Sequence, residues 1–269
     1  MKKVFFVVFI VVLFYGCVQK SNQVNTDSVS VVNNTVTVEN LNIEMVAVQS
    51  GTITIGCTPE QGDDCRDAEK PAHRVNVSDF YIGKYEVTQA QWKAVMGDNP
   101  SNFIGDNLPV ERVSWNDVQE FISKLNDLTG MEYRLPTEAE WEFAARGGLN
   151  SQGYKYCGSN VASEVAWIES NSEKTTHEVG TKMPNELGIY DMSGNVLEWC
   201  NDWLGQYTDI GKINPKGAGS GTYRVGRGGS WGSPERVVRV SARSGNNPDS
   251  RASNLGFRLA YSEKQERLP

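Results

Sequence analysis

The pattern of apolar and polar positions predicts a domain that begins near Glu44 with short strands. The stretches MVAVQSGTITIG (45–56) and RVNVSDFYIGKYEVT (74–88) contain short alternating runs that are typical of strands. From Gly147 onward, Gly, Asn, Ser and Pro divide the chain into short strands and loops. The C-terminal stretch 223–261 holds two more alternating runs around a turn-rich insert, so it can both close a core and display a surface.

Three helices are predicted between these regions, because three segments carry the signals of a capped helix start. Each has Ser or Thr at the cap and Gln, Asp or Glu three positions later: Thr88 with Gln91, Ser114 with Asp117, and Thr137 with Glu140. The middle helix has the clearest apolar face and can end at a glycine; its face consists of Val118, Phe121, Ile122, Leu125 and Leu128, before Gly130.

The tripeptide Trp115-Asn116-Asp117 also occurs at the calcium sites of sugar-binding lectins. Here it falls in the first turn of the predicted middle helix, where Asn and Asp serve as caps. We therefore interpret it as part of a helix start, and not as a calcium site.

The N-terminus has the pattern of a targeting segment. Lys2 and Lys3 precede an unbroken apolar run from Val4 to Phe14, which is too short for a membrane-spanning helix of about 20 residues. The junction at Gly16-Cys17 resembles a bacterial lipoprotein signal, so we expect residues 1–16 to be removed and Cys17 to carry lipid. A short anchor or an ordinary cleaved signal is the alternative.

The expected organisation after the signal is a tether, a domain and a tail. Residues 17–41 are rich in Ser, Asn, Thr and Val and contain no aromatic residue, which is typical of a flexible tether. The domain then covers 42–262, and 263–269 form a polar tail. A lipid-anchored position in the bacterial cell envelope follows, with the membrane as one partner.

Composition limits the remaining partners. The hydrophobic content of 39% supports a real core, and the formal net charge of −7 leaves no basic excess to meet phosphates. Nucleic acid is therefore excluded as a partner.

The four cysteines after Cys17 are expected to form disulfides, because their number is even in an exported chain. Cys57 and Cys65 are close in sequence and would close a small polar loop; Cys157 and Cys200 then pair by elimination. A zinc site with His73 is the alternative, but its spacing matches no zinc pattern.

Four ordered blocks resemble the formylglycine-generating enzyme (sulfatase-modifying factor) family. They are RLPTEAEWEFAARGG (134–148), NELGIYDMSGNVLEWCNDW (185–203), RGGSW (227–231) and NNPDSRASNLGFRLA (246–260). The resemblance extends over roughly residues 44–262. It implies an α+β fold of the irregular C-type-lectin-like kind, with a small antiparallel sheet, about three helices and long ordered loops.

The resemblance also implies a structural calcium ion around the block YDMSGNVLEW. Carried over by position, Asp191 and Glu198 would provide carboxylate oxygens, and Gly194 and Val196 backbone carbonyls. Hard oxygen ligands suit calcium. The alternative is a turn in which the two carboxylates bind nearby amides.

The catalytic residues that the resemblance implies are missing. The family's oxidase binds copper through two cysteines after its Gly-Gly-Ser block, whereas here no cysteine follows Cys200 and the nearest positions are Gly232 and Ser233. Serine cannot replace a thiolate for Cu(I), so no copper is expected. The two histidines, His73 and His177, give neither a three-histidine iron site nor a recognisable Ser-His-Asp relay. A carboxylate-pair glycosidase stays open, but no pair is singled out.

We therefore expect no catalytic residue and predict a ligand-binding surface in the C-terminal stretch. Arg beside an aromatic residue is common in interaction surfaces. The predicted ligand-binding residues are Trp231, Gly232, Ser233, Glu235, Arg236, Arg239, Ser241, Arg243, Asn246, Asn247, Arg251, Ala252 and Ser253.

The predicted function is a non-catalytic, membrane-anchored lipoprotein that binds a protein or a glycan. Its small and polar surface residues also resemble those of variable proteins of this branch, in which a retroelement rewrites codons of a C-terminal repeat. Two alternatives stand beside this prediction: an oxidase-like or other sulfatase-modifying enzyme, and a structural partner in an envelope assembly.

Overall fold

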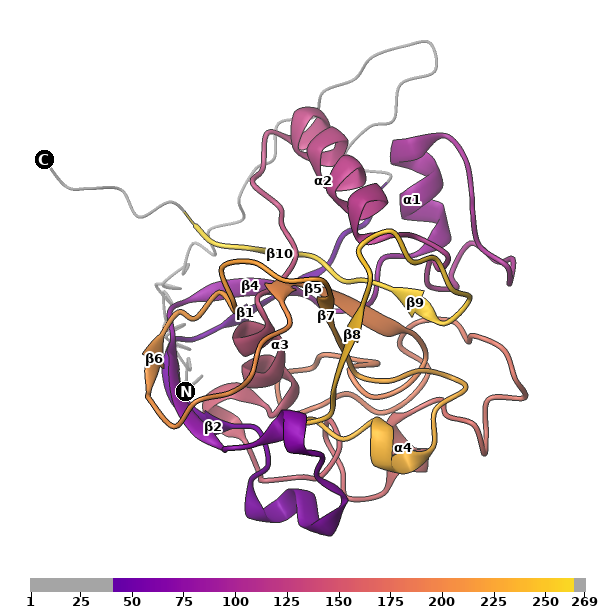
Figure 1. Cartoon of the computed structure of the whole chain (residues 1–269). Helices are drawn as coiled ribbons and strands as arrows, with labels where there is room; N and C mark the ends of the chain where they lie inside the picture. The colour runs from indigo at the N-terminus through magenta and orange to yellow at the C-terminus, as the bar shows by residue number, and fades with distance from the viewer. Residues whose placement is uncertain (1–40, 264–269) are drawn as a thin grey trace, which may run out of the picture.

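Three small sheets and three main helices, joined by long loops, form the part of the chain that the computed structural model describes, residues 41–263 (Figure 1). The predicted signal, Cys17, and all of the tether and tail except Leu41 and Glu263 lie outside these residues. Leu41 itself is buried and packs with residues of the helices α1 and α2. No helix within 41–263 has the length and apolar character needed to cross a membrane.

The three sheets bring together strands that are far apart in the sequence. The first has the order β1 (Met45–Val48), β4 (Phe80–Gly83) and β10 (Ala260–Tyr261), and the second has β2 (Gly51–Ile55), β3 (His73–Val77) and β6 (Lys212–Ile213). The third has the order β8 (Arg243–Asn246), β7 (Arg224–Arg227), β5 (Leu197–Trp203) and β9 (Leu255–Gly256). Most pairs are antiparallel, but β3–β6 and β5–β9 are parallel. The domain therefore has three small sheets in place of the single one that was expected. The last strands of the chain, β8, β9 and β10, are edge strands of two of these sheets.

The helices begin where the sequence predicts. They are α1 (Gln89–Met96), α2 (Trp115–Thr129), α3 (Glu138–Ala145) and a short α4 (Ala162–Val165). In the first three, the side chain of the cap residue accepts a hydrogen bond from the backbone N–H three positions later. The side chain of that later residue in turn accepts from the backbone N–H of the cap residue. Short 3-10 segments lie at η2 (Pro59–Asp64), which is kinked at Gly62, and at η3 (Asp67–Glu69), η4 (Gly148–Asn150) and η5 (Glu235–Val237).

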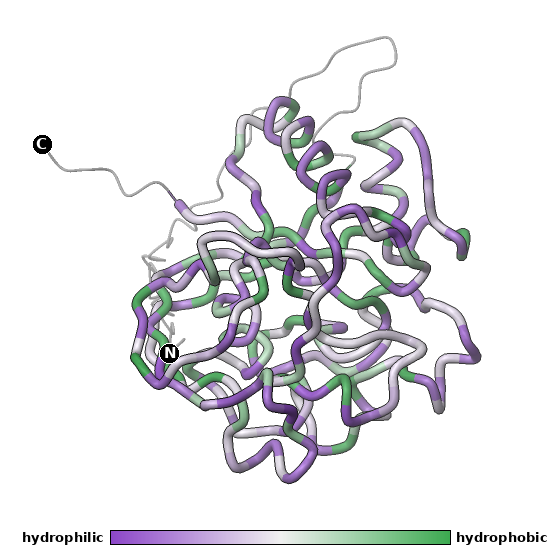
Figure 2. The backbone as a smooth tube through the Cα atoms, viewed as in Figure 1, coloured by the Kyte–Doolittle hydropathy of each residue, from purple (hydrophilic) through white to green (hydrophobic). Residues whose placement is uncertain are grey.

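Helix α2 lies beside α1 (Figure 1), and its apolar face is buried. Hydrophobic and hydrophilic positions alternate along it in Figure 2. Val118, Phe121 and Leu125 are fully buried, whereas Leu128, which the sequence pattern placed on the same face, is 42% exposed. The last turn of α2 thus extends beyond the core.

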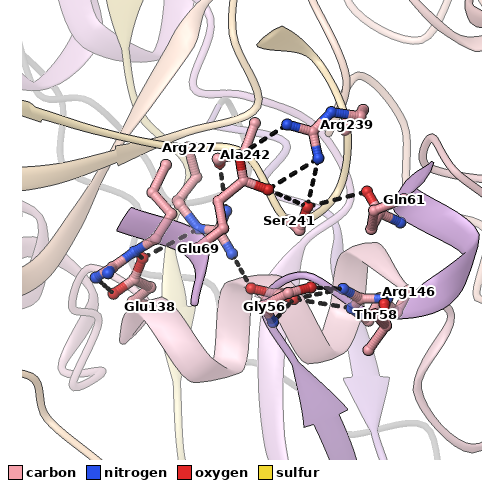
Figure 3. Close-up of polar contacts among 12 residues, drawn as sticks. Gly56, Thr58, Gln61, Glu69, Glu138, Arg146, Arg227, Arg239, Ser241 and Ala242 are labelled. Atoms are coloured by element: carbon pink, nitrogen blue, oxygen red, sulfur yellow. Dashed lines mark hydrogen bonds and ion pairs between the residues drawn. The ribbon is translucent and has the colours of Figure 1, made fainter. Parts of the chain in front are cut away.

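The rest of the interior contains buried Arg–Glu pairs next to apolar side chains. The guanidinium of Arg227 pairs with Glu142, and Arg243 pairs with Glu138 at 2.6 and 2.5 Å. Arg239 pairs with Glu69 in the same region (Figure 3). These pairs also hold loop carbonyls, because Arg227 donates to the carbonyl oxygen of Ala242 and Arg239 to that of Asp64. Buried side chains thus satisfy backbone groups that no strand or helix partners.

One of the two expected disulfides is present. Cys57 and Cys65 are bonded, with 5.8 Å between their Cα atoms, and close the loop that contains η2. Cys157 and Cys200 are separate free thiols, so their pairing by elimination was wrong. Both are buried in one apolar cluster, where they pack as small hydrophobic side chains, and burial raises the pKa of each thiol.

Candidate binding face

A tight turn after β7 presents Trp231 at the surface. Gly229 has a φ of +66°, and a Cβ there would lie 2.7 Å from the side chain of Val238, so the turn requires glycine. The backbone N–H of Trp231 donates to the carbonyl of Asn195 at 2.8 Å, and its indole N–H donates to the carbonyl of Ser253 at 3.0 Å. The ring is half-buried and held on two sides. With its N–H already used, it offers a partner mainly apolar surface.

The loop between α1 and α2 adds two apolar residues to this surface. The ring of Phe103 meets Trp231 edge-on, with 5.5 Å between the ring centroids, and Ile104 beside it is 73% exposed. The loop is fixed by the buried carboxylate of Glu111, which accepts from the backbone N–H groups of Asn102 and Phe103. Sequence reasoning missed this loop, although an Ile within a run of Asn, Gly and Asp was a visible signal.

The loop 247–253 borders the same surface and is tied to the start of α2. Arg251 makes two hydrogen bonds of 2.8 and 2.6 Å to the carboxylate of Asp117, and Asn116 donates to Asp249 at 2.6 Å. Burial opposes ionisation of Asp117, but Arg251 and Ser114 together lower its pKa. Asn116 and Asp117 therefore hold a surface loop as well as starting the helix. Arg251 is exposed, as predicted, but it already has a carboxylate partner.

We define the Trp231 face as Phe103, Ile104, Trp231, Gly232, Ala252 and Ser253. Of the predicted ligand-binding residues, Ser233 and Asn246 are half-buried and Asn247 is exposed. Glu235 and Arg236 are exposed in η5. The predicted set therefore does not form one continuous patch.

Three predicted surface residues are inside the protein, and this part of the prediction was wrong. Arg239 and Ser241 are fully buried and bond to Glu69 (Figure 3). Arg243 is buried against Glu138. The sequence showed polar residues that interrupt a strand pattern. It did not show that carboxylates from distant segments cover them.

Two hydroxyl groups occupy the region to which the resemblance assigned the family's thiols. Ser230 and Ser233 lie with 3.2 Å between their Oγ atoms, and Asn254 donates to Ser230 at 3.2 Å. No histidine contacts them within residues 41–263: His177 bonds to the carbonyl of Ser172 and stacks on Trp167 with ring centroids 3.7 Å apart. This arrangement offers hydroxyl, amide and indole groups, and no thiolate.

The four residues carried over for calcium are all buried, and two carboxylates among them have different surroundings. Both oxygens of Glu198 accept from Arg258, at 2.6 Å each, and one also accepts from Trp141. Asp191 accepts from the N–H of Gly180 through Oδ2, while its Oδ1 is buried without a hydrogen-bond partner. Asp191 thus fits a cation ligand, but Glu198 does not while Arg258 holds it. In residues 41–263 no group of three His, Cys, Asp or Glu side chains is arranged to hold a metal.

A third buried carboxylate, that of Glu86, lies in this region. Glu86 is fully buried and accepts from the backbone N–H of Val196 and the side chain of Asn195. Burial, with repulsion from Asp191 and Glu198, raises the pKa of Glu86. Burial raises the pKa of Asp191 to about 6. A cation beside Asp191 would oppose that rise.

Residues 32–263 match the family described as "Sulfatase-modifying factor enzyme 1-like domain". Among curated relatives, the chain is 37% identical over 240 residues to "Chaperone protein LppX" of Paenibacillus barcinonensis, covering 70% of this chain and 82% of that protein. It is 36% identical over 192 residues to the formylglycine-generating enzyme of Streptomyces coelicolor, covering 65% of this chain and 59% of the enzyme.

Solved structures show the same fold. The variable protein 1 of Treponema denticola superimposes with a TM-score of 0.74 at 34% identity, covering 81% of this chain and 94% of that one. PvdO from Pseudomonas aeruginosa gives a TM-score of 0.71 at 28% identity, with 82% and 95% covered. The expected α+β fold of the formylglycine-generating enzyme type is confirmed.

Proposed function

Because the chain belongs to the sulfatase-modifying factor enzyme 1-like domain family, we propose that it uses this family's scaffold for binding, and that the Trp231 face contacts the ligand. The protein acts without catalysis, at the bacterial cell envelope, where lipid on Cys17 attaches it to a membrane.

One observation carries this proposal: a rigidly held, half-buried indole stands between Ser230 and Ser233 in the chain, in the region assigned to the family's thiols, and contacts Phe103, whose neighbour Ile104 is exposed. Hydroxyls bind Cu(I) poorly. Aromatic and aliphatic side chains on a fixed backbone are instead typical of the centre of an interface.

Two relatives support a binding role at the envelope. One is named a chaperone protein and the other a variable protein, and neither name denotes an oxidase. For this chain we propose a displayed face whose residues differ among copies through the action of a retroelement. The genome should then hold a near-identical template repeat and a reverse-transcriptase gene close to this gene; without both, diversification is excluded.

The test compares three variants of the full-length protein on protein and glycan arrays. We expect Ile104→Ser and Trp231→Ala to lower the signal of the bound ligand at least tenfold. Leu149→Ser is the matched control, because Leu149 is 56% exposed and packs near Gly51, among residues separate from the Trp231 face. Equal binding by all three variants would refute the Trp231 face, provided that their melting temperatures match the wild type.

An oxidase is the second candidate, because the Streptomyces enzyme is 36% identical to this chain. We expect no formylglycine when a cysteine-containing peptide is incubated with the protein, copper and oxygen, since the only free thiols within residues 41–263 are the buried Cys157 and Cys200. Copper-dependent conversion of the peptide would establish the enzyme and overturn the non-catalytic proposal.

A further inference from the structure

A cavity of about 170 Å³ lies under the segment that follows β5. Its walls come from the start of α3, the end of β5, the ends of β2 and β3, and the segment 205–218. It shares no lining residue with the Trp231 face. The volume is well below the roughly 300–1,000 Å³ of drug-sized pockets, so a ligand can be no larger than a single amino acid or sugar acid.

The covering segment lies close to the end of β5. Gly217 has a φ of +73°, and a Cβ there would lie 2.6 Å from the Cβ of Asp202 and 2.9 Å from the carbonyl of Trp203. A side chain at this position would therefore push the segment away from the cavity. Glycine permits the close approach.

One side of the cavity is aromatic and apolar. Tyr207 and His73 meet edge-on, with 4.5 Å between their ring centroids, and Trp203, Ile55 and Pro215 complete this side. Such walls suit the carbon part of a small molecule.

Most charges around the cavity are already balanced. The guanidinium of Arg243 donates hydrogen bonds to Glu138 and to the carbonyls of Ala68 and Gly205. Behind it, Arg227 and Arg146 share Glu142, and Arg146 also pairs with Glu60. These three arginines and three glutamates cancel one another.

Two cations near the cavity are not balanced in this way. Lys212 lines the cavity, and Arg224 is stacked between Trp115 and Trp203, with its guanidinium carbon 3.8 and 3.6 Å from the ring centroids. Within residues 41–263, neither has a carboxylate in ion-pair distance. The one other acid of the lining is Asp202, whose pKa is raised to about 7 by burial and by Glu138. The net charge of the groups around the cavity is therefore positive near neutral pH.

A hydrogen-bond donor also belongs to the lining. The hydroxyl of Tyr207 is buried and makes no hydrogen bond of normal distance and angle among the described residues, although the carboxylate of Glu138 lies close to it. A buried hydroxyl without a well-formed hydrogen bond destabilises the fold, and an acceptor on a ligand would satisfy it.

We propose that this cavity binds a small carboxylate, with its charged group between Lys212 and the Tyr207 hydroxyl and its carbon part against Ile55, Trp203 and Pro215. The site is independent of the Trp231 face.

The test measures binding of two acids to the full-length protein in detergent by isothermal titration calorimetry at pH 7. N-acetylglycine represents an amino-acid source and glucuronic acid a sugar source, and the neutral counterparts are N-acetylglycinamide and glucose. We expect at least one acid to bind tenfold more tightly than its neutral counterpart, and the better acid identifies the source.

Variants locate the site. Lys212→Met and Tyr207→Phe should each weaken binding of the better acid about tenfold, and Gly217→Ala should also weaken it. Lys174→Met, an exposed lysine outside the cavity lining, should bind as the wild type does, and so should Trp231→Ala. Lys212 is exposed, so its loss should leave the melting temperature unchanged.

The proposal is overturned if neither acid gives saturable binding to the wild type up to millimolar concentration. It is equally overturned if the acids and their neutral counterparts bind alike, or if Lys212→Met binds as well as the wild type.

Discussion

Buried arginines organise the interior of this domain at the scale of single residues. Arg227, Arg239 and Arg258 are fully buried, and each is paired with a glutamate. Removing one partner of such a pair leaves the other charge buried without compensation, which costs more than the pair itself contributes.

Arg239 gives the clearest test of these pairs. Arg239→Ala leaves the fully buried carboxylate of Glu69 without its guanidinium, so we expect the free energy of unfolding to fall by about 3–5 kcal/mol. Urea denaturation measures this change. The control is Arg236→Ala in the same segment, which is exposed and should change stability by less than about 0.5 kcal/mol. Similar small effects of both variants would contradict the buried pair.

Stability should also depend on pH through Asp202. Burial, and then repulsion by Glu138, raise its pKa from 3.8 to about 7, so the folded protein holds a proton that the unfolded chain releases above pH 4. This contribution is complete below about pH 4 and is lost as pH rises to 7, at a cost on the order of a few kcal/mol.

Urea denaturation of wild type and Asp202→Asn at pH 5 and pH 8 checks this dependence. The amide cannot ionise, so the variant should lose less stability between the two pH values. Asp191, with a pKa raised to about 6, changes stability in the same direction and remains in both proteins. An equal loss in both proteins would show that Asp202 is not responsible.

At the scale of elements, the loop closed by Cys57 and Cys65 covers the buried pair of Arg239 and Glu69. Arg239 donates to the carbonyl of Asp64 in this loop, and Ser241 donates to Gln61. The disulfide holds this loop in place in the folded protein and reduces the number of conformations open to the unfolded chain.

We expect Cys57→Ser/Cys65→Ser to lower the free energy of unfolding by about 2–4 kcal/mol. Alkylation of the unfolded, non-reduced wild type should modify Cys157 and Cys200 and leave Cys57 and Cys65 unmodified. Mass spectrometry identifies the modified residues. If Cys157 and Cys200 resist alkylation, they form a second disulfide after all.

The turn around Asp191 is the element where a metal ion is still a prediction. Among the described residues its Oδ1 has no hydrogen-bond donor, so calcium bound at this turn would raise the melting temperature by several degrees relative to EDTA-treated protein. Asp191→Asn should abolish the difference. A wild-type melting temperature that is the same with calcium and with EDTA would remove calcium from this protein.

At the scale of the whole molecule, the predicted attachment to the membrane lies outside the folded domain. The family match begins at residue 32, and the described structure begins at Leu41, packed in the core. We expect a radiolabelled fatty acid to label the wild type in cells and not Cys17→Ala, because the thiol is the acceptor of lipid. Equal labelling of both would exclude Cys17 as the attachment site.

Several features followed from the sequence alone because they depend on neighbouring residues. The caps at Thr88, Ser114 and Thr137 form as predicted, since a capping box needs only residues three positions apart. The disulfide between Cys57 and Cys65 closes a short loop, and the four ordered blocks were enough to identify the family and hence the fold.

Only the tertiary structure decided which polar residues face water. Arg239, Ser241 and Arg243 belong to a polar-looking stretch, yet Glu69 and Glu138 from distant segments enclose them. The same folding placed Phe103 beside Trp231 and left Cys157 and Cys200 as separate free thiols. Burial depends on contacts between residues more than a hundred positions apart, and local sequence carries no direct record of those contacts.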